Sequence, residues 1–126
     1  MSEINRPLSP HLTAYKWTVA SSLSILHRAT GVFLSLSTLA LIGWVVAAAT
    51  DSETYGQLTA LLGGPLGLLL LFGFSLSFFY HLGNGIRHLV WDAGYGFDKT
   101  VARLSGWFTL LAAVLVTLIF WAGVWS

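Results

Sequence analysis

The chain has 126 residues, no cysteine and very few charged side chains. Without thiolates it cannot form an internal disulfide, a zinc–thiolate site or its own iron–sulfur cluster. Charged residues make up 9% of the sequence, against about 25% in soluble domains. The formal net charge is +1, and no basic run could follow the phosphates of a nucleic acid. A Gly-rich dinucleotide fingerprint is also missing. These absences exclude most soluble redox and nucleic-acid-binding classes.

Long apolar runs are what the sequence does contain. The chain is 56% hydrophobic, with mean hydropathy +0.76. About 20 helical residues cross the ~30 Å hydrocarbon core of a bilayer, and three segments qualify, about 22–49, 66–91 and 104–125. The runs are rich in Leu and Ala and lack the alternation of barrel strands. We predict an all-α integral membrane protein: one anchor domain over 1–126, with an N-terminal cytoplasmic arm at 1–20 and three transmembrane helices that form part of a heteromeric bundle.

The charges of the connecting segments predict an orientation. The connection at 50–64 holds acidic residues and no basic one, whereas 92–103 holds Lys99 and Arg103, and the N-terminal segment holds Arg6 and Lys16. Because basic residues favour the cytoplasmic side, we expect a cytoplasmic N-terminus and a periplasmic C-terminus. Tryptophans are expected at both interfaces, and all six fall near predicted span ends: Trp17, Trp91 and Trp107 inside, and Trp44, Trp121 and Trp125 outside.

The first sixteen residues are polar and contain Pro7 and Pro10. They lack the apolar core and cleavage site of a signal peptide, and they do not form an Arg-rich amphipathic transit sequence. We therefore expect a mature protein of the bacterial inner membrane. The arm is either a simple surface segment or a docking segment for a peripheral subunit.

His81 lies in a stretch from Thr54 to Ile86 that has no acidic residue, lysine or arginine. An ionisable residue inside a membrane is a candidate functional residue, and a neutral imidazole is a common ligand of haem iron. Ser77 and Gly85 lie four residues to either side and share its helix face. Gly85 would let a flat porphyrin approach the backbone. The alternative is a histidine that is simply hydrogen-bonded between helices.

Arg28 is predicted to lie at the same depth as His81. It follows Trp17 by roughly 16 Å of helix, and His81 precedes Trp91 by roughly 15 Å. Ser24 lies one turn from Arg28 on the same face, so a hydroxyl and a guanidinium could bind a carbonyl compound together. The alternatives are that Arg28 snorkels to the headgroups and that Ser24 bonds its own helix backbone.

Two more residues near the cytoplasmic end of the second span bear on the site. His88 is seven residues after His81, on the same face, and could contact a haem propionate. The rise of ~10.5 Å between them leaves room for one haem. Asp92 opposes the helix macrodipole at a C-terminus, so we expect it to pair with a basic group such as Arg87.

The third span has no ionisable residue in its interior, and we interpret it as structural.

Three motifs together resemble the cytochrome b membrane-anchor subunit of succinate dehydrogenase, which is complex II or succinate:quinone oxidoreductase. They are Arg6-Pro7-Leu8-Ser9-Pro10-His11-Leu12, Ser24-Ile25-Leu26-His27-Arg28-Ala29-Thr30-Gly31 and His81-Leu82-Gly83-Asn84-Gly85-Ile86-Arg87-His88-Leu89-Val90-Trp91-Asp92. Their order, spacing and placement against the three spans match this family, and the resemblance covers nearly the whole chain.

The resemblance implies specific roles for residues of this chain. His81 matches the axial ligand of haem b, and a second membrane subunit would supply the other ligand. Ser24 and Arg28 match ubiquinone-site residues, with Ile25 lining the pocket. His27, Arg28 and His88 match positions near the haem propionates. No residue of this chain would be catalytic in the strict sense, and the haem would be shared with the partner subunit.

The resemblance also implies a role in the tricarboxylic acid cycle and the respiratory chain. Electrons from succinate would pass from a flavoprotein subunit through an iron–sulfur subunit to ubiquinone at this anchor. The chain would thus be a non-flavin subunit of an enzyme complex. Three alternatives remain: a fumarate reductase anchor, a haem-free structural anchor, and a proton-channel subunit that uses His81.

Overall fold

The structure is a computed structural model that describes residues 11, 14 and 16–126. Its regular elements are four α-helices, and the described residues contain no strand: α1 (Val19–Thr50), α2 (Ser52–Gly63), α3 (Pro65–Asp92) and α4 (Lys99–Val124). The three long helices α1, α3 and α4 are long and apolar enough to cross a membrane. The prediction of an all-α membrane protein with three spans is therefore confirmed. Most of the predicted N-terminal arm lies outside the described residues.

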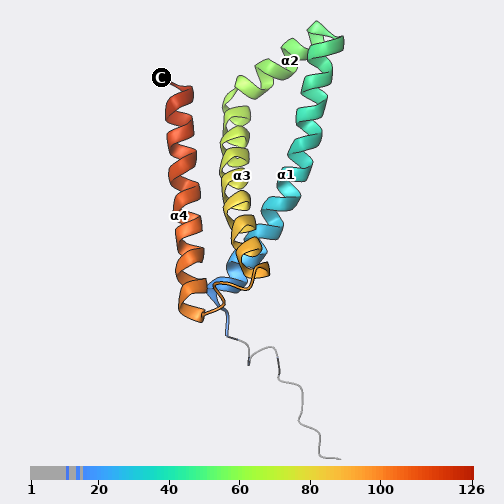
Figure 1. The fold of residues 1–126 in the computed structure, drawn as a ribbon. Helices are drawn as coiled ribbons and strands as arrows, with labels where there is room; N and C mark the ends of the chain where they lie inside the picture. Colours follow the sequence, from blue (N-terminus) through green and yellow to red (C-terminus); the bar gives the residue numbers. More distant parts are fainter. Residues whose placement is uncertain (1–10, 12–13, 15) are drawn as a thin grey trace, which may run out of the picture.

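Helix α3 lies in the middle of the bundle, as Figure 1 shows. Helix α4 packs alongside α3, whereas α1 crosses α3 near the beginning of α1 and diverges from it toward α2. The beginning of α1 and the α3–α4 connection lie at one end of the molecule, and α2 and the C-terminus lie at the other. The basic residues Lys16, Lys99 and Arg103 therefore share one end, opposite Asp51 and Glu53.

Helix α2 occupies the segment that the sequence reading assigned to a simple connection. Asp51 caps its N-terminus by accepting hydrogen bonds from the Glu53 amide and the Thr54 hydroxyl. Gly64 ends the helix, and Pro65 follows at the first position of α3, where proline is well tolerated because its missing N–H would have no partner there. These capping signals produce an extra helical segment between two spans.

The turn between α3 and α4 depends on two glycines in the left-handed region. Gly94 has φ of 89° and Gly96 has φ of 79°, conformations that only glycine adopts without steric cost. The indole N–H of Trp91 donates to the Gly96 carbonyl at 3.1 Å. Asp98 then caps α4 by accepting from two backbone amides, so α4 begins at Lys99, before the predicted start at 104.

Helix α4 presents to its neighbours a stripe of small residues and threonines that ends in Trp121. The buried residues recur at helical spacing: Gly106, Thr109, Ala113, Thr117 and Trp121. Most other large apolar side chains of the described residues are exposed within the isolated chain. Such surface is suited to lipid tails and to other membrane helices.

Candidate functional site

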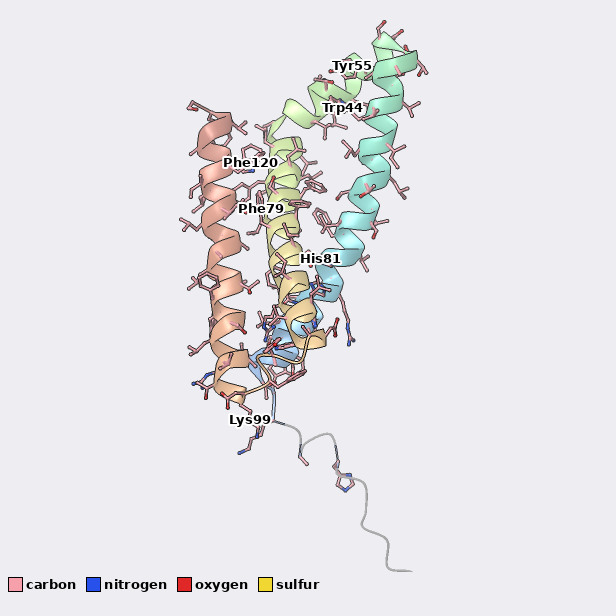
Figure 2. The ribbon with its side chains drawn as sticks, viewed as in Figure 1. Trp44, Tyr55, Phe79, His81, Lys99 and Phe120 are labelled. Carbon is pink, nitrogen blue, oxygen red and sulfur yellow. The ribbon has the colours of Figure 1, made fainter. Side chains whose placement is uncertain are left out.

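His81 of α3 meets α1 where the two helices cross, as Figure 2 shows. Its Nδ1 lies 3.2 Å from the backbone carbonyl oxygen of His27 and 3.2 Å from the hydroxyl of Thr30. The contact falls on the turn of α1 that also carries Arg28. His81 and Arg28 therefore come from neighbouring turns of crossing helices, as their predicted depths indicated.

The contact with the His27 carbonyl assigns the tautomer of His81. A carbonyl oxygen can only accept a hydrogen bond, so Nδ1 must carry the proton for this contact to form. Nε2 then keeps its lone pair, and it has no hydrogen-bond partner among the described residues. A metal-binding histidine is typically held in this way, with one nitrogen protonated and donating while the other ligates.

Close packing surrounds the His81 ring on the side of α1. The ring of His27 stacks on it, with centroids 3.9 Å apart and planes 14° from parallel. A Cβ added to Gly31 would stand 3.0 Å from Cε1 of His81, so only glycine lets the ring approach this closely without adjustment. His88 lies with its ring centroid 5.3 Å from that of His27. Three histidines thus gather at this crossing.

These residues fit a haem bound through His81. Nε2 is the nitrogen left free to ligate, and the position beside it on the same helix face, Gly85, is open: a Cβ there would meet nothing within 4 Å. Nδ1 of His27 is buried without a hydrogen-bond partner, as expected of a polar atom that awaits a group from outside the described chain. Bound here, a haem would be held by one axial ligand from this chain.

The predicted quinone-site residues lie on the first turns of α1. Ser24 is half-buried, whereas Ile25 and Arg28 are exposed. The side chains of Ser24 and Arg28 make no hydrogen bond to any described residue, so the backbone bond considered as an alternative for Ser24 is not formed. Nearby, the hydroxyl of Tyr80 donates to the carbonyl of Leu23 at 2.8 Å. This buried bond holds α3 against the turn that carries Ser24.

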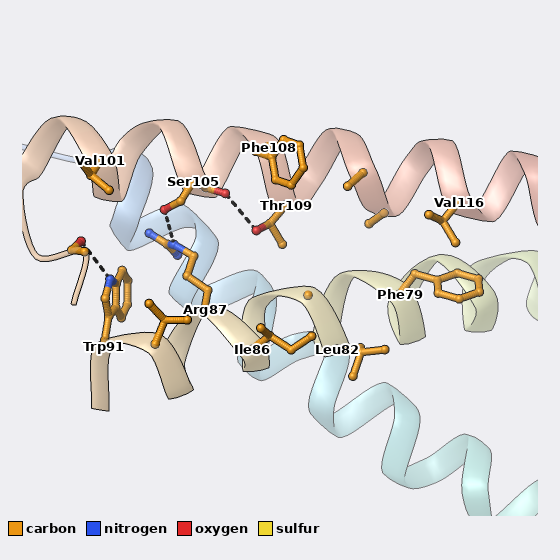
Figure 3. Close-up of a pocket in the computed structure, with 15 residues that line it drawn as sticks. Phe79, Leu82, Ile86, Arg87, Trp91, Val101, Ser105, Phe108, Thr109 and Val116 are labelled. Atoms are coloured by element: carbon orange, nitrogen blue, oxygen red, sulfur yellow. Dashed lines mark hydrogen bonds between the residues drawn. The ribbon is translucent and has the colours of Figure 1, made fainter. Parts of the chain in front are cut away.

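Arg87 does not pair with Asp92, so that prediction was wrong. Its guanidinium turns toward α4 and donates to the Ser105 hydroxyl at 3.0 Å, the Ala102 carbonyl at 2.7 Å and the Asn84 side-chain oxygen at 3.1 Å. Asp92 is exposed, because five residues are roughly 1.4 helical turns and place it on another face of α3. Figure 3 shows Arg87 reaching Ser105 across the seam between the two helices.

A cavity of about 530 Å³ lies between α3 and α4. Its lining is almost wholly apolar apart from Arg87, Ser105 and Thr109 (Figure 3). His81 does not line it, because that side chain faces α1. The cavity and the histidine cluster therefore lie on different faces of α3.

Sequence reasoning did not find Thr30 or Tyr80 as neighbours of the site. Thr30 lies within the quoted α1 motif, three residues after His27, and Tyr80 immediately precedes His81. Both residues could have been noted from the sequence because each lies in or next to a quoted motif. Their contacts depend on how α1 and α3 cross, which helical periodicity within one segment does not specify.

Comparison with known proteins gives a consistent family. Residues 2–120 match the family described as succinate dehydrogenase/fumarate reductase transmembrane subunit. The chain is 43% identical over 116 residues to the succinate dehydrogenase cytochrome b556 subunit of Rickettsia prowazekii, covering 92% of this chain and 90% of that protein. It is 42% identical to the cytochrome b560 subunit of Reclinomonas americana, covering 94% and 85% of the two chains.

A more distant relative agrees with these two. The cytochrome b556 subunit of succinate dehydrogenase from Paracoccus denitrificans is 35% identical, with 91% of this chain and 88% of that protein covered. The match to the family extends over all three long helices, and the relatives are similar in length to this chain. The chain belongs to the succinate dehydrogenase/fumarate reductase transmembrane subunit family and is a cytochrome b membrane anchor of complex II.

Proposed function

We propose that this anchor binds haem b through His81, forms part of a ubiquinone site with Ser24, Ile25 and Arg28, and passes electrons from the iron–sulfur subunit to quinone. The observation that carries the proposal is the orientation of His81. Its Nδ1 is held by α1 at two oxygen atoms, which leaves Nε2 for a metal. The names of the relatives, cytochrome b556 and b560 subunits, support a b-type haem.

The residues around His81 would hold the haem from one side. His81 would hold the iron through one imidazole nitrogen, and a second membrane-anchor subunit would supply the other ligand. His27, Arg28 and His88 are the candidates for the propionates, because the His27 ring stacks on His81, the His88 ring lies beside that of His27, and Arg28 follows His27 in α1. The haem, when bound, supplies a one-electron redox centre whose potential the protein tunes through ligand and burial.

The haem proposal is tested by His81→Leu in the assembled complex. We expect loss or destabilisation of the six-coordinate b-type spectrum, because the other histidine at this depth, His27, lies on α1 and does not share the helix face that carries Gly85. Phe78→Leu, an apolar change at an exposed position of the same helix, is the matched control and should keep the spectrum. An assembled His81→Leu complex with an unchanged spectrum would exclude His81 as the ligand.

Expression of this chain alone tests the shared haem. A single axial histidine should not give a bis-histidine haem, so we expect stoichiometric haem only when the second membrane subunit is present. Recovery of a stoichiometric bis-histidine haem from this chain alone would contradict the shared site.

At the quinone site, Arg28 would supply positive charge where negative charge develops on a quinone oxygen, an electrostatic role. Ser24 would hydrogen-bond the other carbonyl oxygen. Both side chains are without hydrogen bonds to the described residues, and the two positions are one turn apart on α1. They are therefore free to bind a ligand that enters from outside the chain.

Quinone reduction separates these roles from the rest of the complex. We expect Ser24→Ala and Arg28→Leu to lower succinate–quinone reductase activity, with the larger loss for Arg28, and to leave succinate oxidation by an artificial dye intact. Removal of one charge-stabilising group costs roughly 10²–10³ in rate in hydrolases, and we expect a smaller loss where electron transfer shares control. Ser37→Ala and Arg103→Leu, on the same helix and at the beginning of α4, are matched controls. Wild-type quinone reductase activity in assembled Arg28→Leu complexes would favour snorkelling instead.

We further propose the bacterial inner membrane as the location, with the beginning of α1 and the α3–α4 turn in the cytoplasm. Support comes from the basic residues gathered at that end of the structure. The iron–sulfur and flavoprotein subunits would bind on this side. The family description includes fumarate reductase, but the names of the relatives favour succinate oxidation.

A further inference from the structure

We propose that Thr30 is a positioning residue for the haem ligand: its hydroxyl, together with the His27 carbonyl, fixes the orientation of the His81 ring and sets how strongly the ring donates electrons to iron. The inference rests on the proposed function of His81 as an axial ligand. It adds a residue of α1 that does not touch the iron but acts through the ligand.

The geometry of the Thr30 hydroxyl makes it an acceptor for His81. Oγ1 lies 2.9 Å from the carbonyl oxygens of Leu26 and His27, and its single proton is directed to these two acceptors. Its lone pairs remain to accept from Nδ1–H of His81 at 3.2 Å. Only 8% of Thr30 is exposed, so water cannot easily replace this contact.

Two acceptors therefore share the proton on Nδ1. The His27 carbonyl is polarised by the Thr30 hydroxyl that it also accepts, and both oxygens face the same ring nitrogen. A hydrogen bond donated by the outer nitrogen of a ligating imidazole raises the basicity of the ligand. A more basic ligand stabilises the oxidised metal and lowers its midpoint potential. Loss of the Thr30 acceptor should raise the potential.

The competing explanation is that Thr30 simply bonds its own helix, as threonines often do. Thr38 provides the comparison on the same helix. Its hydroxyl donates to the Leu34 carbonyl at 2.9 Å and lies at an exposed position without a histidine contact. Thr38→Val therefore removes the same kind of backbone bond without affecting an iron ligand.

The test is a redox titration of the haem in the assembled complex, combined with the electron paramagnetic resonance spectrum of the ferric haem. We expect Thr30→Val to raise the midpoint potential and shift the g values. Thr30→Ser restores the hydroxyl and should return both toward wild type, and Thr38→Val should change neither. An unchanged potential in haem-loaded Thr30→Val, or an equal shift in Thr38→Val, would overturn the proposal.

Loss of haem also gives a decisive result. If Thr30→Val does not assemble, Thr30→Ala removes the same hydroxyl with less bulk and is measured instead. Loss of haem from both variants, with retention in Thr30→Ser and Thr38→Val, supports the positioning role. Loss from Thr38→Val as well, or from Thr30→Ser, contradicts it.

His81→Leu distinguishes failure of this inference from failure of the proposed function. If His81→Leu keeps the native spectrum, His81 is not the ligand and the proposed function fails first. If His81→Leu loses haem while haem-loaded Thr30→Val matches wild type in potential and g values, the ligand stands and only the role of Thr30 is wrong.

Discussion

The His81 ring packs against α1 at a residue with no side chain. Gly31 faces Cε1 of His81 at a distance that leaves no room for an ordinary Cβ contact. The stacked His27 ring fixes the other side of the imidazole. The ring is therefore confined from α1 on two sides, and its position depends on the volume of residue 31.

We expect Gly31→Val to displace the His81 ring and to lower the haem content of the complex, because a branched side chain cannot fit where one Cβ is already tight. Gly43 lies on the same helix with open space around its Cβ position, so Gly43→Val is the control for helix propensity and bulk. Absorbance of the reduced haem per complex is the measurement. Equal haem in both variants would show that α1 can move away from His81 at little cost.

The sequence predicted that His81 and Arg28 lie at similar depths, but it did not predict which side chains contact the site residues. Their depths could be predicted because each residue lies at a known helical distance from a tryptophan expected at the membrane interface. The partner of Arg87 was not predicted, because Asp92 is only five residues away in the sequence but lies on another face of α3. The hydroxyl of Ser105 comes from α4, and only the packing of two helices brings it to the guanidinium.

At the scale of the elements, the seam between α3 and α4 is held by a buried polar cluster. Arg87 is 7% exposed and Asn84 is 1% exposed, and the guanidinium also lies over the Trp91 ring, 4.1 Å from its centroid. Gly106 of α4 packs against Leu23 and Arg87. The cluster thus joins three helices close to the histidines.

Arg87→Met should loosen this seam. The change removes the Arg87 donor from three oxygens. The Ala102 carbonyl keeps the Ser105 hydroxyl as a donor, but the Asn84 oxygen loses its partner, and an unsatisfied buried polar group costs about 1–3 kcal/mol. We expect a lower thermal midpoint of the complex in detergent, measured by loss of the haem spectrum or by light scattering. Arg103→Met, at an exposed arginine of α4, is the control. A midpoint equal to the control would show that the cluster contributes nothing to packing.

The cap of α2 depends on one ionised carboxylate. Hydrogen bonds from the Thr54 hydroxyl and the Glu53 backbone amide hold the pKa of Asp51 below its usual value. The stabilisation is complete above the unfolded-state pKa of about 3.9 and is lost as the pH falls through the lower folded-state pKa. We expect protection of α2 amides from hydrogen exchange, corrected for intrinsic rates, to stay constant from about pH 5 to 8. Asp51→Ala should lower it throughout, and Asp51→Asn, which keeps a capping oxygen, should lower it less. Equal protection in Asp51→Ala and wild type would contradict the role of the cap.

Helix ends were harder to predict than helix existence. Hydropathy identifies segments that are long and apolar enough to cross a bilayer, so it found the three spans. It did not predict α2, which consists of mixed polar and apolar residues between two of them. The start of α4 at Lys99 depends on the Asp98 cap, which hydropathy does not register. Gly94 and Gly96 adopt positive φ just after α3 ends at Asp92, so residue type marks this end clearly.

At the scale of the whole molecule, the chain buries few of its large apolar side chains. Leu36 and Leu39 of α1, for example, are more than half exposed. Under the proposed haem site, in which a second subunit supplies one ligand, we expect part of this surface to face that partner and the rest to face lipid. The orientation of the bundle in the membrane is then set by the basic residues at one end of it.

A reporter fusion at Ser126 tests that orientation. The C-terminus and the basic end of the structure lie at opposite ends of the bundle, so the positive-inside rule predicts a periplasmic C-terminus. Alkaline phosphatase fused there should be active, and a reporter that works only in the cytoplasm should be silent. A fusion in the α3–α4 turn should give the reverse pattern. The opposite result at both sites would invert the proposed topology.

The bond between His81 and α1 joins two equilibria that are usually considered apart. With His81 as the iron ligand, one ring nitrogen would bind the metal, while the other donates a hydrogen bond to α1 at its crossing with α3. By thermodynamic linkage, the formed crossing raises the affinity for haem by the same coupling free energy by which bound haem stabilises the crossing. Haem occupancy would then report a correctly packed α1–α3 pair, and a misassembled anchor would lack both this packing and the haem absorbance.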